Sequence, residues 1–220
     1  MGYSRMDIFQ KCEAGLSNIK MFYKQPFINY NGRTTDTNEL YTEVVAEFLS
    51  QNLDQFVAGF PVITRNQSYK TKGHSGIFDE STPREEVKIA MEMYRQSVSG
   101  VRYDFIGDII DYQTPLKNER ADKAGKIDLL SYDGEILRIL ELKKPDSEES
   151  MLRAVLEGFT YLKTVDKDKL LKDFELSSDT IIKASPLVFR NSMQNTQMHE
   201  HRPWLFNLMK LLDSKPYYIT

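Results

Sequence analysis

Charged residues inside two short apolar segments restrict the fold of this chain more than any other feature. Asp128 lies within the apolar residues 127–132, and Glu141 lies near the end of residues 135–142, just before Lys143. Removing a charge from water without a partner is costly, and charges that persist in such segments often belong to a metal or catalytic site. The chain must therefore give these groups partners, a function, or both.

A tight turn between the two segments predicts how they pair. The dipeptide Asp133-Gly134 is typical of a two-residue hairpin loop in which both residues adopt positive φ. This loop would place Asp128 opposite Ile139 and would make Glu141 its diagonal neighbour, roughly 7–8 Å away at the backbone. Two carboxylates at this separation can converge on one divalent cation.

Side-chain alternation predicts which residues share a face of the hairpin. Successive side chains on a strand point to opposite faces, so Glu141 and Lys143 share one face while Leu140 and Leu142 point into the core. An amphipathic hairpin with a wet polar face, in which Lys143 neutralises Glu141, gives the same pattern. The apolar opposite face and the helix-forming segment that follows favour a hairpin inside an α/β sheet.

The composition is that of an ordinary globular protein and excludes several classes. The chain has 220 residues, of which 28% are charged and 40% hydrophobic, and its net charge is −3. A nucleic-acid partner would therefore meet a local basic patch and not a global positive field. The single cysteine, Cys12, excludes a disulfide framework and a cysteine-rich zinc site. No signal segment or membrane-spanning apolar run is found, so we expect a cytoplasmic protein without membrane contact.

Hydrophobic periodicity and capping residues predict the order of the elements. Before the hairpin, the chain is predicted to form a helix over 37–53, a short strand over 59–65, a helix that opens with Ser81-Thr82-Pro83 and ends at Gly100, a strand over 105–112 and a polar loop over 113–125. After the hairpin, it is predicted to form a helix from 145–147 onward, a strand over 180–189 and a closing helix within 199–220. Asp146 and Glu149 are expected to cap the helix after the hairpin. Pro186 is expected to make its strand an edge or a kink.

The order helix, strand, strand, strand, helix, strand resembles the PD-(D/E)xK, or restriction-endonuclease-like, nuclease superfamily. Asp128, Glu141 and Lys143 match its three signature positions, and the resemblance covers about residues 85–189. It implies an α/β fold with a central mixed sheet of four or five strands flanked by helices. Residues 83–220 would form the nuclease-like core with a C-terminal helix, and residues 1–82 an N-terminal helical and loop extension of unknown role.

The resemblance also implies a chemistry for these residues. Asp128, Glu141 and the carbonyl of Leu142 would supply oxygens to Mg²⁺, for which Mn²⁺ is expected to substitute. The metal would polarise the scissile phosphate and acidify a bound water. Lys143 would orient or deprotonate that water or stabilise the developing charge. The predicted function is a metal-dependent nuclease that acts on DNA in preference to RNA.

Members of the superfamily often add an acid from the helix before the first core strand. By position this is Glu86, with Glu85 as its neighbour, and Glu43 on the earlier helix is the alternative. Compensation of the helix dipole in the first turn explains Glu85 and Glu86 equally well.

Three further residues are expected to meet nucleic acid. RecB-like and Cas4-like branches carry Gln-xxx-Tyr on the helix after the lysine, and this chain has Glu157 and Tyr161 at that spacing. Glu cannot donate the hydrogen bond that Gln offers. Tyr161, Arg153 one turn before Glu157, and Lys126 are the candidate contacts. A packing or salt-bridge role explains Arg153 and Tyr161 as well.

A second class of function is compatible with the same sequence. A catalytically inactive nuclease-like domain that binds nucleic acid or a protein partner would keep the fold without cleavage. The mild overall acidity and the unmatched N-terminal region favour this alternative, whereas the intact acid, acid and lysine set favours the enzyme. A homodimer is a further arrangement that such nucleases use to cut both strands.

Overall fold

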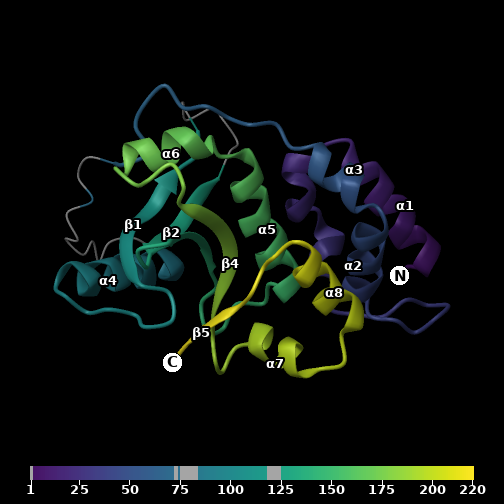
Figure 1. Cartoon of the computed structure of the whole chain (residues 1–220). Coiled ribbons are helices and arrows are strands. Elements are labelled where there is room, and N and C mark those ends of the chain that lie inside the picture. The colour runs from purple at the N-terminus through teal and green to yellow at the C-terminus, as the bar shows by residue number, and fades with distance from the viewer. Residues whose placement is uncertain (1, 72–73, 75–83, 118–124) are drawn as a thin grey trace.

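A five-stranded mixed sheet forms the centre of the protein (Figure 1). The structure is a computed structural model and describes residues 2–71, 74, 84–117 and 125–220. In sheet order the strands are β1 (Asp108–Pro115), β2 (Lys126–Tyr132), β3 (Ile136–Leu142), β4 (Ile181–Phe189) and β5 (Tyr217–Ile219). The first three strands are antiparallel, and β3, β4 and β5 run parallel. The predicted α/β class with a mixed sheet is confirmed.

Helices cover both faces of this sheet. The helix α4 (Glu85–Val98) packs on β1 and β2, and α5 (Met151–Thr164) packs on β3 and β4. The predicted N-terminal helical region is confirmed, and it lies beyond α5 in Figure 1. The remaining helical segments are α1 (Arg5–Leu16), η1 (Ile19–Lys24), η2 (Pro26–Asn29), α2 (Tyr41–Gln51), α3 (Leu53–Ala58), α6 (Lys167–Asp173), α7 (Met193–His199) and α8 (Pro203–Leu211).

Alternation along β3 divides its side chains between two hydrophobic clusters. Leu137 and Ile139 belong to the cluster that contains α5, and Leu140 and Leu142 belong to the cluster that contains α4. Helices therefore bury both faces of this strand, as expected for a strand inside an α/β sheet. The face of Leu137 and Ile139 continues to Glu141 and Lys143, so these two charges are directed toward α5.

The hairpin between β2 and β3 has a longer loop than predicted. The pairs Leu129–Leu140 and Tyr132–Leu137 leave four residues in the loop, and only Gly134 of the Asp133-Gly134 pair has positive φ, at 105°. The Asp133 carboxylate instead accepts the backbone N–H groups of Glu135 and of Ile136, the first residue of β3. The predicted pairing is therefore wrong by two residues, a shift that keeps every side chain on its predicted face.

Three element predictions need correction. The segment 59–65 is no strand, since only Ile63 makes an isolated bridge there. The helix α5 begins six residues later than predicted, because Ser150, and not Asp146, caps its N-terminus. The closing segment contains β5 as well as α7 and α8. The predicted Ser81-Thr82-Pro83 start of α4 lies outside the described residues.

The strand β4 is not an edge strand, one of the two alternatives predicted from Pro186, because it lies inside the sheet. It pairs with β3 on one side and β5 on the other. The backbone carbonyl of Leu187 accepts a hydrogen bond from the backbone N–H of Lys143 on the β3 side. Because successive residues of a strand direct their backbone groups to opposite sides, the backbone nitrogen and carbonyl of Pro186 face the β5 side. Pairing with β5 begins only at Leu187, so no partner at Pro186 requires the missing N–H.

The N-terminal region shares its core with the rest of the molecule. One cluster of buried residues extends from Ile8 to Leu212, and α2 packs against α8. The predicted division of the chain into an extension over residues 1–82 and a core over residues 83–220 stays a prediction. None of the described helices is long and apolar enough to cross a membrane.

Candidate active site

A cavity of about 370 Å³ opens between α4, the first three strands and α5. Its lining contains seven side chains that the sequence predicts as catalytic, metal-binding or nucleic-acid-binding residues, but not the alternative acids Glu85 and Glu43. The lining residues are Arg84, Glu86, Gln113, Lys117, Gly125, Lys126, Asp128, Glu141, Lys143, Glu149, Arg153, Glu157 and Tyr161. Residues far apart in the sequence therefore meet in one place.

Asp128 occupies the middle of a row that crosses three strands. The residue pairs next to Asp128 in the β1–β2 and β2–β3 pairings place it between Gln113 on β1 and Glu141 on β3. Its carboxylate accepts Gln113 Nε2 at 2.9 Å and the backbone N–H of Leu142 at 3.1 Å. Burial raises the pKa of Asp128 to about 7, an effect that nearby Lys143 opposes.

Glu141 is the most deeply placed acid of the cavity. Its side chain is only 5% exposed, and its Oε1 lies 2.8 Å from Lys143 Nζ. Its Oε2 is buried without a hydrogen-bond partner among the described residues. Burial, together with the nearby Asp128 and Glu157 carboxylates, raises the pKa of Glu141 well above its ordinary value. A buried carboxylate oxygen without a partner is costly unless another group completes it.

Lys143 is the central cation of this cluster. Its ammonium lies 2.8 Å from Glu141, 2.6 Å from Glu149 and 3.3 Å from Glu157, and its side chain is 4% exposed. Burial alone would lower the pKa of Lys143, but these three carboxylates outweigh burial and raise it well above its ordinary value. The group therefore stays protonated, which suits charge stabilisation better than proton abstraction.

Glu157 and Tyr161, one turn apart on α5, form the wall opposite the sheet. Tyr161 donates its hydroxyl hydrogen bond to Glu157 Oε1 at 2.7 Å, and its oxygen lies 3.3 Å from that of Tyr23. Glu157 Oε2 faces Lys143. The glutamate thus accepts from two donors. A glutamine at this position would accept with only one oxygen, so the departure from the Gln-xxx-Tyr pattern fits its surroundings.

Sequence reasoning missed two residues that contact Asp128 or Lys143 in this site. Glu149, expected in a capping box, instead pairs with Lys143 and with Arg153, whose Nε lies 2.9 Å from Glu149 Oε1. Gln113, expected in a loop, lies on β1 with φ at +48° and holds Asp128. Positive φ is uncommon for a residue other than glycine, and such backbone often positions functional side chains. No sequence signal indicates it.

The three candidate helix acids have separate locations. Glu86 lines the cavity, and its Oε1 accepts the backbone N–H of Lys144 at 3.4 Å. Glu85 is more exposed and pairs with the Lys144 side chain. Glu43 lies outside the cavity and accepts the backbone N–H groups at the start of α8. Glu86 is therefore the helix acid that accompanies Asp128 and Glu141.

The residues of the cavity fit a magnesium ion held by two carboxylates. No group of three or more histidine, cysteine or acidic side chains within the described chain is arranged to enclose a metal. Mg²⁺ needs no such cage, because it usually takes one or two carboxylates and keeps several waters. Asp128 lies opposite Glu141, and the unpartnered Glu141 Oε2 is available as a ligand. The Leu142 backbone lies beside Asp128.

No protein-family model, curated protein or solved structure matches this chain.

Proposed function

We propose that the protein is a metal-dependent nuclease that hydrolyses phosphodiester bonds of nucleic acid, with DNA as the favoured substrate. The observation that carries this proposal is the meeting of Asp128, Glu141 and Lys143 on one face of β2 and β3, at the base of an open cavity. A purely structural ion pair explains Lys143 and Glu141, but not the unpartnered carboxylate oxygen beside them.

The charges of the cavity support a need for a divalent cation. Among the described residues, five acids (Glu86, Asp128, Glu141, Glu149, Glu157) and five bases (Arg84, Lys117, Lys126, Lys143, Arg153) line it, so the formal charges of these ten residues cancel. A phosphate gains little from a neutral site. With a dication the site becomes positive and suits an anionic substrate.

Each residue has a proposed role in the hydrolysis. Asp128, Glu141 and the carbonyl of Leu142 would hold Mg²⁺ or Mn²⁺, with Glu86 beside them. When bound, the ion would polarise the phosphate and acidify a water. The ammonium of Lys143 would stabilise negative charge that develops on the phosphate oxygens. Arg153 and Lys126 on the cavity wall would orient the backbone of the substrate.

The test is a cleavage assay on single- and double-stranded DNA and RNA with Mg²⁺, Mn²⁺ or EDTA. Asp128→Asn and Glu141→Gln keep the shape of the side chains and remove a proposed metal ligand. We expect each to reduce cleavage by about 100-fold or more, the range seen when one electrostatic group is removed from an active site. Asp54→Asn, an acid on α3 outside the cavity, is the matched control and should cleave normally.

Two results would contradict the proposal. Cleavage that persists in EDTA or in Asp128→Asn would place the activity elsewhere. Metal-independent binding of nucleic acid without cleavage under any condition would favour the inactive nuclease-like domain. Lys143→Ala is a poor variant for this assay, because it leaves three carboxylates without their shared cation.

A further inference from the structure

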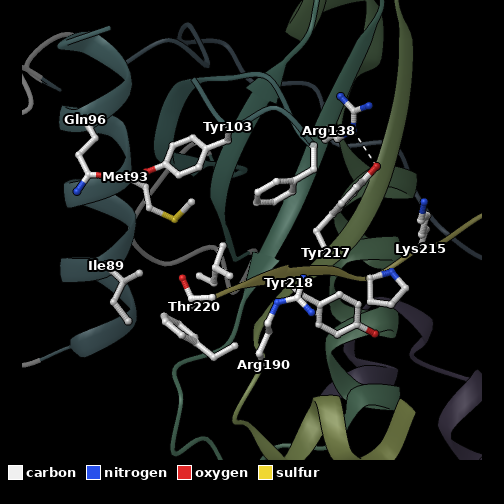
Figure 2. A pocket seen from close by; sticks show the side chains of 14 residues that line it. Ile89, Met93, Gln96, Tyr103, Arg138, Arg190, Lys215, Tyr217, Tyr218 and Thr220 are labelled. Carbon is white, nitrogen blue, oxygen red and sulfur yellow. Dashed lines mark hydrogen bonds between the residues drawn. The ribbon is translucent and has the colours of Figure 1, made fainter. Parts of the chain in front are cut away.

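A second, larger cavity lies on the α4 side of the sheet, on the face opposite the candidate active site. It has a volume of about 1000 Å³ and opens between α4, the segment before β1, and β5 (Figure 2). Figure 2 shows Ile89, Met93 and Gln96 of α4 along one wall, with Tyr217 and Tyr218 along the other. We call this cavity the β5 groove.

Aromatic rings form much of the surface of the β5 groove. Five rings line it, those of Tyr103, Phe105, Phe189, Tyr217 and Tyr218. Phe105 is 42% exposed, and its ring centre lies 6.2 Å from that of Tyr217, with the two planes inclined at 32°. A large ring that exposes so much of its surface beside other rings offers a face on which a further planar group can stack.

Three cationic side chains accompany these rings, and one of them is paired with an acid. Arg138, Arg190 and Lys215 line the groove, and no Asp or Glu side chain of the described chain does so. Arg138 is neutralised by Asp133 at 2.7 Å and donates to the Tyr217 hydroxyl at 3.0 Å. Arg190 lies over the Tyr218 ring at 5.7 Å, and neither Arg190 nor Lys215 forms an ion pair within the described chain. Arg190 and Lys215 are therefore the two cations of the groove that could pair with an anionic ligand.

The helix α4 connects the two cavities. Glu86 in its first turn lines the candidate active site, and Ile89, one turn later, lines the β5 groove. The N-terminal half of α4 therefore borders both cavities.

We propose that the β5 groove binds a single-stranded segment of nucleic acid, whose bases stack on Phe105 and neighbouring rings and whose phosphates contact Arg190 and Lys215. The exposed ring of Phe105, with partly buried rings and two cations beside it, suits a single strand, because unpaired bases offer their faces and each phosphate carries a charge. A duplex keeps its bases stacked on one another. The proposal rests on the proposed function for the identity of its ligand, since the bound segment would flank the cleaved bond.

The experiment measures binding of a fluorescein-labelled oligothymidylate to the full chain in EDTA, where cleavage plays no part. Phe105→Ala and Phe105→Leu should each raise the Kd about fivefold or more, because both remove the aromatic face on which a base would stack. Phe105→Leu keeps an apolar side chain of similar size, so it separates the loss of stacking from the loss of apolar volume. The double variant Arg190→Gln/Lys215→Gln should reduce the slope of log Kd against log salt by about 1.4, or roughly 0.7 for each lost phosphate contact. Lys172→Gln/Lys210→Gln, which removes two charges outside both cavities, should change neither quantity.

The outcomes separate this inference from the proposed function. Weaker binding in both groove variants, with circular dichroism unchanged, supports the groove even if no metal-dependent cleavage is found. Binding equal to wild type in both groove variants overturns it, even if Asp128 proves essential for cleavage. Normal binding in Phe105→Leu with loss in Phe105→Ala also overturns it, because that result indicates an apolar partner and not a stacked base. A wild-type chain that does not bind the oligonucleotide overturns it as well.

Discussion

Asp128 and Glu141 face each other across two strands, and nearby Lys143 partly offsets both charges. Burial raises the pKa values of both carboxylates, so keeping them ionised lowers the stability of the fold. At the residue scale, the charge state of Asp128 therefore affects stability.

This link predicts how stability depends on pH. The pKa of Asp128 is about 7 in the native state and near 3.9 in an unfolded chain. Between these values the native state binds more protons, so the contribution of Asp128 to stability falls as the pH rises from about 4 to about 7. Above pH 7 the penalty is complete and amounts to roughly 4 kcal/mol at most, less where cavity water screens the charge.

Asp128→Asn should therefore unfold at a higher temperature than wild type at pH 8, and the difference should vanish toward pH 4. The new amide can still be satisfied, because the Gln113 side chain can rotate to present its carbonyl oxygen. Thermal unfolding followed by circular dichroism in EDTA measures this, with Asp54→Asn as the control. A variant that is less stable than wild type at pH 8 would show that the ionised carboxylate stabilises the fold.

At the scale of elements, the start of α5 decides where Glu157 and Tyr161 lie. Ser150 is fully buried, accepts the N–H of Arg153 at 3.1 Å and donates to the carbonyl of Ile28 at 2.9 Å. One side chain thus caps α5 and ties it to η2. Ser4 caps α1 in the same way, but at an exposed position and with Asp7 as its only partner.

Comparison of Ser150→Ala with Ser4→Ala separates the effect of the helix cap from that of the hydrogen bond between Ser150 and the Ile28 carbonyl. Loss of a cap costs about 1 kcal/mol in either helix. Ser150→Ala also leaves the Ile28 carbonyl without its donor, so we expect a total of about 2–3 kcal/mol for this variant. Urea unfolding measures both free energies. Equal costs would mean that the bond to Ile28 contributes nothing to stability.

At the scale of the whole molecule, the N-terminal region completes the core. Glu43 caps α8 through the backbone N–H groups of Trp204 and Leu205, and Thr42 accepts from Arg202. Both residues of α2 are buried in this contact. Removal of residues 2–83 would expose the apolar side of α8 and the N-terminal side of α5.

A fragment of residues 84–220 should therefore lose cooperative unfolding. The expected result is a broad transition and binding of a hydrophobic dye, since the shared cluster of buried residues would lose its N-terminal half. Circular dichroism and dye fluorescence measure this against the full chain. A sharp transition near that of the full chain would instead show that residues 84–220 form an independent domain.

The sequence by itself determined the local part of this protein. Asp128, Glu141 and Lys143 lie on two neighbouring strands, and alternation with a period of two assigns them to one face. The prediction of that face held although the predicted pairing was wrong by two residues, because only an odd shift changes the face.

The tertiary structure alone decided the surroundings of these three residues. Gln113 reaches Asp128 through a positive φ, Glu149 reaches Lys143 because α5 starts late, and Glu43 caps α8 from a distant part of the chain. The strand β5 and its groove depend on a three-residue pairing at the end of the sheet. Such contacts are set by packing between remote elements, which leaves no periodic pattern in the sequence.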